Sequence, residues 1–491
     1  MLTRLALVFA ILALVCPSRA QEFHPNIPKA WDDKEVESFE VPLAQRDRSP
    51  RYMSSEEYYK LKARPIYRTY PAYAKGMEPA GYLDWLKQQE PEVIFNPARL
   101  HTKEDWIAAG KIVFEAEIRL FPVRDQPAAA DATGPLGKNG ELFSFVPSQS
   151  YIIRKKGVLE GGVNACADCH VRVLPDGSYL EGAQGIIDTP ITEAQLQRLR
   201  DLTPEALHQR LNTNWVHFGA PWVISRADFE GYYTKDRYIR DVSATHPSVF
   251  RRQGTSFSHP PHVPSLIGIE DHKYLDSTGL VRNRSIGDIM RYAITNQGLD
   301  TLAYYGDFQP SPRRTAFSGD EGTRYSDEQL YALALYLESL KPPPNPNPVD
   351  DRARRGERIF RQQGCAGCHT PPLYTNNKLT PARGFKIPDD LRKTEDILDV
   401  SVGTDPTLAL KTRRGTGFYK VPSLQGVWYR TAFGHTGQAD TLEEWLDPAR
   451  LKPNYMPKGF HIEPGPIEGH EFGLKLSAAD RGDLIAFLKT L

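Results

Sequence analysis

The sequence predicts a mainly α-helical protein with two similar domains in tandem, long irregular loops and an extended N-terminal segment. The chain has 491 residues, which is enough for about three domains of ordinary size. Its 40 prolines and 37 glycines favour irregular segments around modest helical cores over a continuous sheet. Several short motifs also occur twice in the same order, which is the signature of an internal duplication.

The charge balance limits the classes of partner. Lys plus Arg and Asp plus Glu number 61 each, so the chain has no net charge at pH 7. A balanced chain produces no overall field that attracts nucleic acid or an anionic membrane surface. We therefore expect no nucleic-acid partner.

The first residues predict export. Arg4 precedes an apolar run from Leu5 to Cys16, and Ser18 and Ala20 place small residues at a plausible cleavage site. We predict a signal peptide over 1–20 and a mature protein that is periplasmic or secreted. No later run approaches the roughly 20 apolar residues of a membrane helix, so no transmembrane anchor is expected. A lipoprotein anchored at Cys16 is the alternative, although Val15 is bulkier than the residue that lipoprotein processing prefers.

The four remaining cysteines occur in two matching motifs, Cys-Ala-Asp-Cys-His at 166–170 and Cys-Ala-Gly-Cys-His at 365–369. Cys-x-x-Cys-His is the attachment sequence of c-type haem, in which both thiols bind the haem covalently and the histidine ligates the iron. A redox dithiol, or a zinc ion shared by all four cysteines, would not explain why a histidine directly follows the second cysteine of both motifs. The sequence therefore predicts two covalently attached haem c groups, held by Cys166, Cys169, His170, Cys365, Cys368 and His369.

Other repeated segments surround these motifs. Residues 110–114 (Gly-Lys-Ile-Val-Phe) precede the first motif and residues 356–360 (Gly-Glu-Arg-Ile-Phe) precede the second. The Val-Pro-Ser-Leu segment at 263–266 recurs 158 positions later at 421–424. Each half then closes with a capped amphipathic helix, which begins after Ser326 in the first half and after Ser477 in the second.

These repeats define the predicted domains. The first c-type haem domain spans 101–340 and includes a large insertion, and the second spans 351–491. The Pro-rich stretch 341–350 cannot continue a helix and is predicted to be a stiff linker. Residues 21–100 are rich in Tyr, Pro and charge, and we expect an extended segment over the haem domains that is structural or lines a substrate groove.

An asymmetry between the two irons follows from the repeat. A second axial ligand often comes from the loop before the last helix, where the second half has His470. When Ser326 is aligned with Ser477, the position matching His470 is Gly319, which has no ligand atom. We therefore expect His369 and His470 to close the second iron, and the first iron, on His170, to bind oxygen or peroxide. A surface-loop histidine is the alternative for His470, and the rival ligands are His435, His461 and Met456.

Taken together, these residues resemble the dihaem cytochrome c peroxidase superfamily, which includes the enzymes that mature methylamine dehydrogenase and rubber oxygenase A. The resemblance rests on the paired haem motifs, the Val-Pro-Ser-Leu segments, the Phe-Gly-His stretch at 433–435 and the closing residues 484–491. It implies a catalytic haem in the first half and an electron-storing haem in the second. A histidine at position 470, where the peroxidases usually have methionine, is more similar to the rubber-oxygenase branch.

The chain departs from the peroxidase pattern at three places. Where the family has a tryptophan between the haems, this chain has Tyr274, so Tyr274 or Trp428 would pass the electrons unless both are core residues. No glutamate stands where the peroxidases have a distal acid, and Gln297 is the nearest polar candidate, with a surface amide as the alternative. His259 or His262 could close the first iron in a resting state.

The predicted function is therefore that of a dihaem oxidoreductase of the peroxidase type. Cleavage of peroxide takes two electrons, and a second haem can supply one of them. The electrons would come from a small redox donor protein or a small-molecule reductant. The alternatives are a haem dioxygenase resembling rubber oxygenase A, which uses dioxygen, and a dihaem electron-transfer cytochrome without catalysis.

Overall fold

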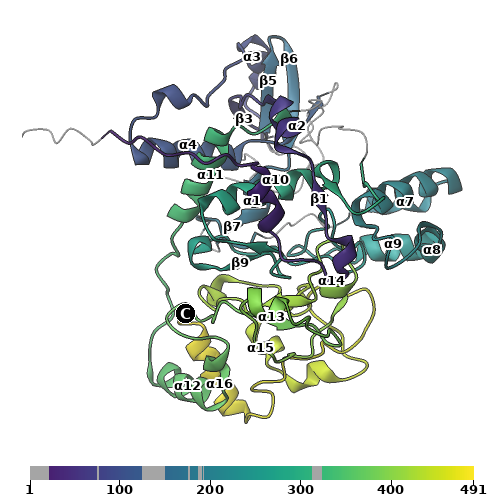
Figure 1. Cartoon of the computed structure of the whole chain (residues 1–491), viewed down its shortest axis with the longest axis vertical. Helices are drawn as coiled ribbons and strands as arrows, with labels where there is room; N and C mark the ends of the chain where they lie inside the picture. Colours follow the sequence, from purple (N-terminus) through teal and green to yellow (C-terminus); the bar gives the residue numbers. More distant parts are fainter. Residues whose placement is uncertain are drawn as a thin grey trace, which may run out of the picture.

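The computed structural model describes residues 22–73, 77–123, 150–174, 177–185, 191, 193–311 and 323–491. Within these ranges the protein is mainly helical with small sheets and long irregular loops, which confirms the predicted fold class at this level (Figure 1). The predicted signal peptide at 1–20 and Gly319 lie outside the described residues. In the described ranges, no helix has the length and apolar character needed to cross a bilayer.

The first half is organised around two helices that cross at a glycine. Helix α4 (Lys103–Glu115) begins with a capping box formed by Thr102 and Asp105, and α11 (Asp327–Ser339) begins with the predicted capping box of Ser326 and Gln329. A Cβ atom on Gly110 would lie only 2.0 Å from the carbonyl oxygen of Ala332 and 2.7 Å from the Cβ of Tyr336. The glycine is therefore what allows the two backbones to approach.

The second half contains the same crossing. Helix α12 (Asp351–Gln362) packs on α16 (Ala478–Leu488), and the two lie side by side at the bottom of Figure 1. A Cβ atom on Gly356 would lie 2.0 Å from the carbonyl oxygen of Asp483 and 2.7 Å from the Cβ of Phe487. Asp483 and Phe487 follow Ala332 and Tyr336 by 151 positions, which is also the spacing of the two capping serines. The closing helices thus correspond residue by residue.

The loops after the haem motifs are also repeated. Gly268 and Gly426 both have a φ of 73° and precede short 3-10 helices, η3 (Ile269–Asp271) and η5 (Val427–Tyr429). Gly279 and Gly437 have φ values of 63° and 65°. Only glycine adopts such left-handed conformations at little cost, so the duplication extends to the backbone conformation of these turns.

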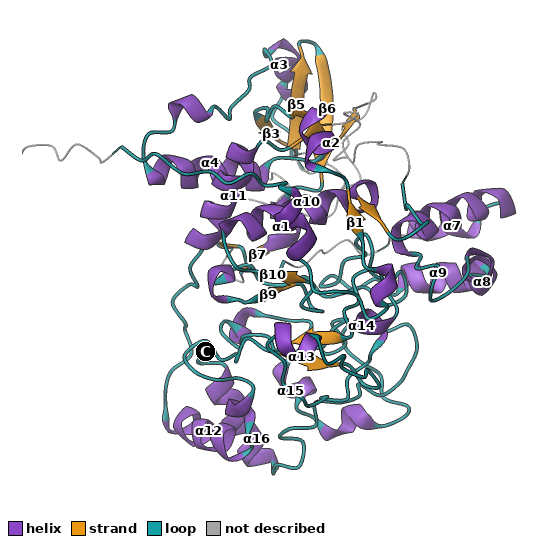
Figure 2. Ribbon diagram, viewed as in Figure 1, coloured by secondary structure: helices purple, strands orange, loops and turns teal. Residues whose placement is uncertain are grey.

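Strands form a minor part of the structure (Figure 2). The largest sheet is antiparallel with the order β3-β5-β6-β4, and it lies at the upper end of the molecule in Figure 2. The sequence did not predict it. The strands are β1 (Arg51–Tyr52), β2 (Lys62–Ala63), β3 (Thr69–Pro71), β4 (Arg119–Pro122), β5 (Ser150–Lys155), β6 (Val158–Val163), β7 (Val171–Val173), β8 (Tyr179–Glu181), β9 (Tyr274–Leu275), β10 (Val281–Arg282), β11 (Ala303–Tyr304), β12 (Thr323–Arg324), β13 (Leu379–Pro381) and β14 (Phe418–Lys420).

The N-terminal segment is integrated with both halves. Strand β1 pairs antiparallel with β11 of the first half, and the backbone N–H of Ala44 donates to the carbonyl of Gly415 in the second half. The indole of Trp31 is fully buried and donates to the carbonyl of Met53. The segment also contains three short helices, α1 (Asp33–Ser38), α2 (Ser55–Lys60) and α3 (Tyr82–Gln88).

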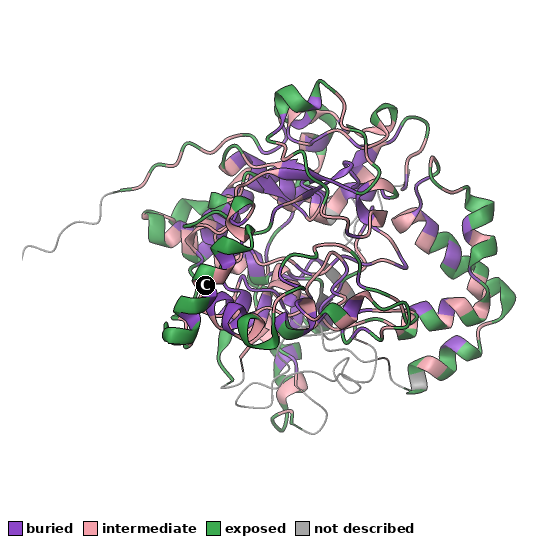
Figure 3. Ribbon diagram, turned by 90° about the horizontal axis from the view of Figure 1, so that it is seen from below, coloured by how far each residue is buried: buried purple, intermediate pink, exposed green. Residues whose placement is uncertain are grey.

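The insertion in the first half forms a small helical core of its own. Its helices are α6 (Glu193–Arg200), α7 (Pro204–Phe218), α8 (Arg226–Tyr232) and α9 (Lys235–Ser243), packed around Trp215 and Phe229. The remaining helices are α5 (Cys166–His170), α10 (Ile286–Leu302), α13 (Leu391–Thr394), α14 (Thr407–Leu410) and α15 (Leu442–Trp445). Figure 3 shows buried residues toward the middle of the molecule and exposed residues on the outer faces of the peripheral helices.

Candidate functional site

Both Cys-x-x-Cys-His motifs lie in tight helical turns. The first forms α5, where the carboxylate of Asp168 accepts hydrogen bonds from the backbone N–H groups of Asn164 at 2.8 Å and Ala165 at 3.1 Å. The second begins in the 3-10 helix η4 (Cys365–Gly367), which follows Gly364 in the left-handed conformation. All four cysteines are free thiols in this structure.

The two motif histidines are held in the same way. His170 Nδ1 lies 3.0 Å from the carbonyl oxygen of Pro264, and His369 Nδ1 lies 3.1 Å from the carbonyl oxygen of Pro422. These prolines are the matching residues of the two Val-Pro-Ser-Leu segments. Because a carbonyl oxygen only accepts, each Nδ1 carries the proton and each Nε2 keeps a free lone pair. In metal sites, a hydrogen bond from the nitrogen that does not bind the metal orients the histidine and fixes its tautomer.

The pKa shifts agree with this assignment. Burial is the main cause that lowers the pKa of His170 to about 4, and it also lowers the pKa of His369. Both rings are therefore neutral at pH 7, which is the form that binds a metal.

The ring of His470 lies near the ring of His369. The centroids of the two rings are 6.3 Å apart. A metal–imidazole bond is about 2.0–2.1 Å, so two imidazoles on opposite sides of one metal ion have centroids roughly 6 Å apart. The enclosed Nδ1 of His470 has no hydrogen-bond partner among the described residues, so the ring is not committed to another contact. The spacing fits two axial ligands of one iron.

The loop that carries His470 is fixed from outside. His470 has a φ of 46°, an unfavourable value for a residue with a side chain, and its N–H donates to the carbonyl of Val402 at 2.6 Å. Arg450, which is fully buried, donates to the carbonyls of Gly469 at 2.8 Å and His470 at 2.9 Å. The ring of Trp445 lies 5.6 Å from the His470 ring. The surrounding contacts therefore impose the strained conformation.

Burial, together with the nearby His369 and Arg450, lowers the pKa of His470 to about 4. His470 is therefore also neutral at pH 7.

These groups line an internal cavity of about 260 Å³ in the second half. Its wall includes both cysteines of the second motif, His369, His470 and mostly apolar side chains, namely Phe360, Leu424, Val427, Phe433, Leu442, Trp445, Leu446, Leu484 and Leu488. An apolar wall with a few convergent polar groups is typical of a cofactor site.

Two basic side chains in this cavity indicate whether its charge suits haem. Lys420 and Arg430 line it. Lys420 Nζ donates to the carbonyl of Tyr274 at 3.4 Å, and Arg430 donates to the carbonyls of Ser423 and Gln425, but neither forms an ion pair with a described residue. Burial lowers the pKa of Lys420 to about 8, and the Nε of Arg430 is enclosed without a partner. Enclosed charges normally have a partner, and haem carries two propionates. The thiols, the two histidines and the unpaired cations therefore fit haem c.

The surroundings of His170 contain a similar feature. The charge of Arg252 acts on His170 and Cys169, and one of its terminal nitrogens, Nη2, is enclosed without a partner. Arg172 also has an enclosed, unpartnered Nη1. Gln297 belongs to α10, but its side chain lies outside the described part of the structure.

Two of the three rival ligands, Met456 and His461, do not line the cavity of the second half, and the third, His435, has another contact. Met456 is 57% exposed. The Nδ1 of His461 lies 2.9 Å from the carbonyl oxygen of Gly459 in its own loop. His435 lines the cavity, but its Nε2 is 2.8 Å from the hydroxyl of Thr404. Of the four candidates from the sequence, His470 is the one placed across from His369.

The structure gives the surroundings of four other residues that the sequence singled out. His259 is surrounded by charged groups of α9 and of the second half, and burial lowers its pKa. Trp428 packs on Tyr429 at 5.0 Å and on the main core. The hydroxyl of Tyr274 donates to Glu395 at 3.1 Å. His262, a candidate for the first iron in the sequence, instead lines the cavity of the second half.

The structure adds residues that the sequence did not indicate. Gln184, Pro264 and Ser277 of the first half line the cavity of the second half. Pro264 is therefore in contact with His170 on one side and with the second cavity on the other. Arg450 holds the His470 loop, and no pattern in a single sequence marks an arginine with this role.

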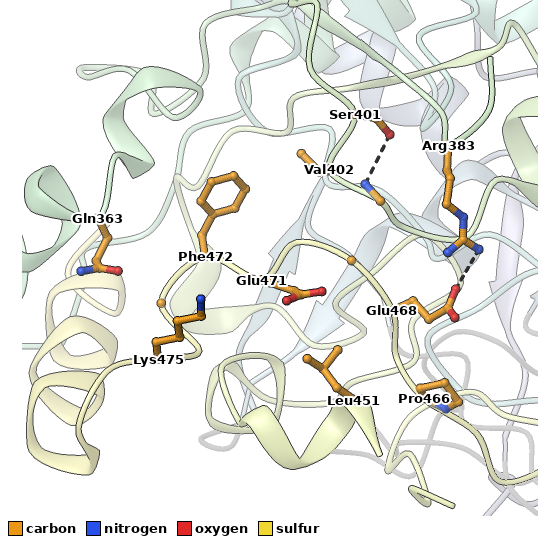
Figure 4. Close-up of a pocket in the computed structure, with 13 residues that line it drawn as sticks. Gln363, Arg383, Ser401, Val402, Leu451, Pro466, Glu468, Glu471, Phe472 and Lys475 are labelled. Atoms are coloured by element: carbon orange, nitrogen blue, oxygen red, sulfur yellow. Dashed lines mark hydrogen bonds and ion pairs between the residues drawn. The ribbon is translucent and has the colours of Figure 1, made fainter. Parts of the chain in front are cut away.

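A surface cleft of about 740 Å³ lies on the outer side of the His470 loop (Figure 4). Arg383 and Glu468 form an ion pair of 2.8 Å across one side of it. Glu471, Phe472 and Lys475 lie on the loop and the residues that follow it. This cleft brings solvent close to the loop that carries His470.

Comparison with known proteins gives weak similarities. No family model matches the chain, and no curated protein matches it. Among solved structures, 18 chains match. One is a Kuenenia stuttgartiensis hydrazine synthase pressurized with xenon, with 14% identity and a TM-score of 0.31 over 62% of this chain and 94% of that chain. Another is a MauG-like protein associated with microbial copper homeostasis, with 15% identity and a TM-score of 0.31 over 62% of this chain and 90% of that chain. At this TM-score, neither similarity supports a conclusion about fold or function.

Proposed function

We propose that the protein is an exported dihaem c-type oxidoreductase that reduces hydrogen peroxide at the first haem, with electrons relayed through the second. The observation that carries this proposal is the pair of Cys-x-x-Cys-His histidines, each bound through Nδ1 to the proline carbonyl of a repeated segment. The placement of His470 across from His369 supports the division of roles.

The chain's residues have defined tasks in this proposal. The four cysteines would attach the two groups, and the free Nε2 atoms of His170 and His369 would hold the irons. Lys420 and Arg430 would neutralise the propionates of a haem in the second cavity. A bound haem supplies reversible electron storage and, where its sixth position is open, a binding position for a small oxidant.

The two sites differ in what they can do. A second site closed by both His369 and His470 has no position for a substrate, so its role is electron transfer. The first site is then the place where peroxide binds. Pro264 contacts His170 and also lines the second cavity, so it offers a short connection between the two sites. A small redox protein or a small-molecule reductant supplies the electrons.

One observation favours a second candidate, a dioxygenase that resembles rubber oxygenase A. The residue facing His369 is a histidine, whereas a methionine is usual in the peroxidases that the sequence resembles. In this candidate, His170 would hold a haem that offers a binding position for dioxygen, and His369 and His470 would hold a haem that stores electrons.

The experiment begins with the absorption spectrum of the reduced holoprotein with and without carbon monoxide. We expect carbon monoxide to change the spectrum of one haem. No change at either haem would indicate an electron carrier and would refute the proposal. Peroxide turnover with a reduced donor is then compared with oxygen uptake on an apolar unsaturated substrate, and oxygen uptake without peroxide turnover would favour the dioxygenase.

A further inference from the structure

The surface cleft beside the His470 loop shares part of its wall with the internal cavity of the second half. Val402 and Phe472 line both the cleft of about 740 Å³ and the cavity that contains His369 and His470. The ring of Phe472 is 42% exposed, and its centroid lies 5.3 Å from that of His470 with 69° between the ring planes. One aromatic side chain is therefore accessible from the cleft and also packs against the proposed second ligand.

The wall between the two spaces is thin and held in place. The N–H of His470 donates to the carbonyl of Val402 at 2.6 Å. A Cβ atom on Gly469 would lie 2.3 Å from the backbone nitrogen of Thr404, so these two backbone segments touch. Gly469 and Gly473, on either side of the loop, have φ values of 74° and 78°. A molecule in the cleft is thus separated from the second site by one layer of residues.

The second site leaves no position on its metal for a reductant. His369 and His470 are placed to close it, so an electron must enter through the wall of the cavity. Phe472 is the aromatic residue that this wall shares with the cleft. The cleft therefore lies at the shortest described route from solvent to His470.

The charges of the cleft favour a neutral small molecule. Two lining residues are basic, Arg383 and Lys475, and two are acidic, Glu468 and Glu471. Arg383 pairs with Glu468 at 2.8 Å, whereas Figure 4 shows no interaction between Glu471 or Lys475 and the other residues drawn. A balanced cleft lacks the net charge that steers a charged protein partner.

The same residues indicate the chemical groups of the ligand. The exposed face of Phe472 suits an aromatic ring. The carboxylate of Glu471 can accept a hydrogen bond from a hydroxyl group, and the ammonium of Lys475 can donate one. The volume of the cleft is in the range of small-molecule sites.

The ligands of the second iron narrow the class of reductant further. A methionine ligand raises the reduction potential of a haem, and His470 stands in the place of such a ligand here. An iron held by two histidines therefore needs a stronger reductant. Naphthalenediols are stronger reductants than benzenediols, and they present the same hydroxyl groups on a larger apolar ring.

We propose that this cleft binds a naphthalenediol-type reductant, whose electrons reach the second site past Phe472 and His470. This inference rests on the proposed function and specifies the reductant in it. One 1,4-dihydroxynaphthalene is oxidised to 1,4-naphthoquinone: both O–H bonds break, two electrons pass in turn to the second site, and two protons pass to Glu471 and solvent. Reduction of one hydrogen peroxide to two waters consumes the same two electrons and two protons.

The test follows anaerobic reduction of the second haem by 1,4-dihydroxynaphthalene in the holoprotein, by stopped-flow absorption. The wild-type rate should saturate with diol concentration, because binding precedes electron transfer. Phe472→Ala should raise the half-saturating concentration about tenfold, as expected for loss of a ring contact. Glu471→Gln, outside the lining of the haem cavity, should raise it as well. Phe250→Ala removes a ring that is 41% exposed and does not line the cleft, and it should match the wild type.

A second readout involves no electron transfer. The isomer 1,3-dihydroxynaphthalene cannot form a quinone by loss of its hydroxyl protons. In isothermal titration calorimetry it should bind the oxidised wild-type holoprotein at one site and bind Phe472→Ala about tenfold more weakly.

The inference is overturned if the wild-type rate rises linearly with diol concentration without saturation. It is also overturned if Phe472→Ala and Glu471→Gln match the wild type in both measurements. Failure of the proposed function is distinguishable, because the second haem is then reduced by the diol as expected but is not reoxidised when peroxide is added.

Discussion

The close crossing of α12 and α16 leads to a sharp prediction for Gly356→Ala. The new Cβ would lie 2.0 Å from the carbonyl oxygen of Asp483, 2.6 Å from its carbonyl carbon and 2.7 Å from the Cβ of Phe487. None of these atoms can move by side-chain rotation. The helices must therefore separate by about 1 Å. A gap of this size removes about a quarter to a half of the attractive energy of each van der Waals contact that it lengthens.

The magnitude follows from two opposing effects. Overpacking of a close contact costs about 3 kcal/mol. Replacing glycine by alanine within a helix recovers about 1 kcal/mol. We expect Gly356→Ala to lower the free energy of unfolding by about 2 kcal/mol. Gly231→Ala in α8, where a Cβ would meet no atom within 4 Å, is the matched control and should raise it by up to about 1 kcal/mol.

The assay is urea unfolding followed by circular dichroism, together with absorption spectra of the holoproteins. Because α16 lines the second cavity through Leu484 and Leu488, Gly356→Ala should alter the spectrum of one haem. Gly110→Ala, at the matching crossing of the first half, should alter the spectrum of the other haem. If Gly356→Ala is as stable as Gly231→Ala, the helices do not cross at this glycine and the reasoning is wrong.

Four further outcomes are expected. His470→Ala should change the spectrum of one haem and regain it with added imidazole, whereas His461→Ala should change neither; a change at both haems would contradict the assignment. Arg450→Met should lower the free energy of unfolding by about 1–3 kcal/mol in urea titrations, because buried carbonyls lose their donor; wild-type stability and an unchanged second-haem spectrum would show that the loop does not depend on it. Arg430→Gln should lower the midpoint potential of the second haem, since removal of a positive charge disfavours the reduced form; an unchanged potential in a redox titration would place the propionates elsewhere. Folding raises the pKa of Glu40 from 4.5 to about 7, so the folded protein binds an extra proton between these pH values. The free energy of unfolding of the wild type should therefore fall by up to about 3 kcal/mol as the pH rises from 4.5 to 8. Unfolding of Glu40→Gln at pH 4.5 and 8 should not show this fall.

Much of the candidate site was predictable because its signals are local. Each Cys-x-x-Cys-His motif consists of five consecutive residues, and each capping box spans four. The 151-residue offset of the closing helices is found by comparing one short segment of the sequence with another. Gly110 and Gly356 are marked by the repeat itself, since each begins a Gly-x-x-x-Phe segment that precedes a motif. The helical content and the irregular loops follow from composition and periodicity.

Other features depend on contacts between distant parts of the chain. The hydrogen bond from His170 to Pro264 joins residues 94 positions apart, and Arg450 reaches the carbonyl of His470 across 20. The sequence favoured His470 only by its loop position over the rivals His435, His461 and Met456, and the distance of 6.3 Å between the His470 and His369 rings comes from the tertiary structure. The four-stranded sheet pairs short strands from distant segments, which have no strong pattern of their own.

The sequence by itself determined two Cys-x-x-Cys-His motifs and the repeated segments around them, because both consist of short runs of neighbouring residues. Only the tertiary structure decided which side chains lie near each histidine and that the carboxyl of Glu40 has an enclosed oxygen with no hydrogen-bond partner among the described residues. Glu40 meets its neighbours from the second half only after the N-terminal segment, α10 and the loop at Arg414 have packed together. Burial and the identity of nearby charges are properties of that packing, and they set the protonation of the carboxyl.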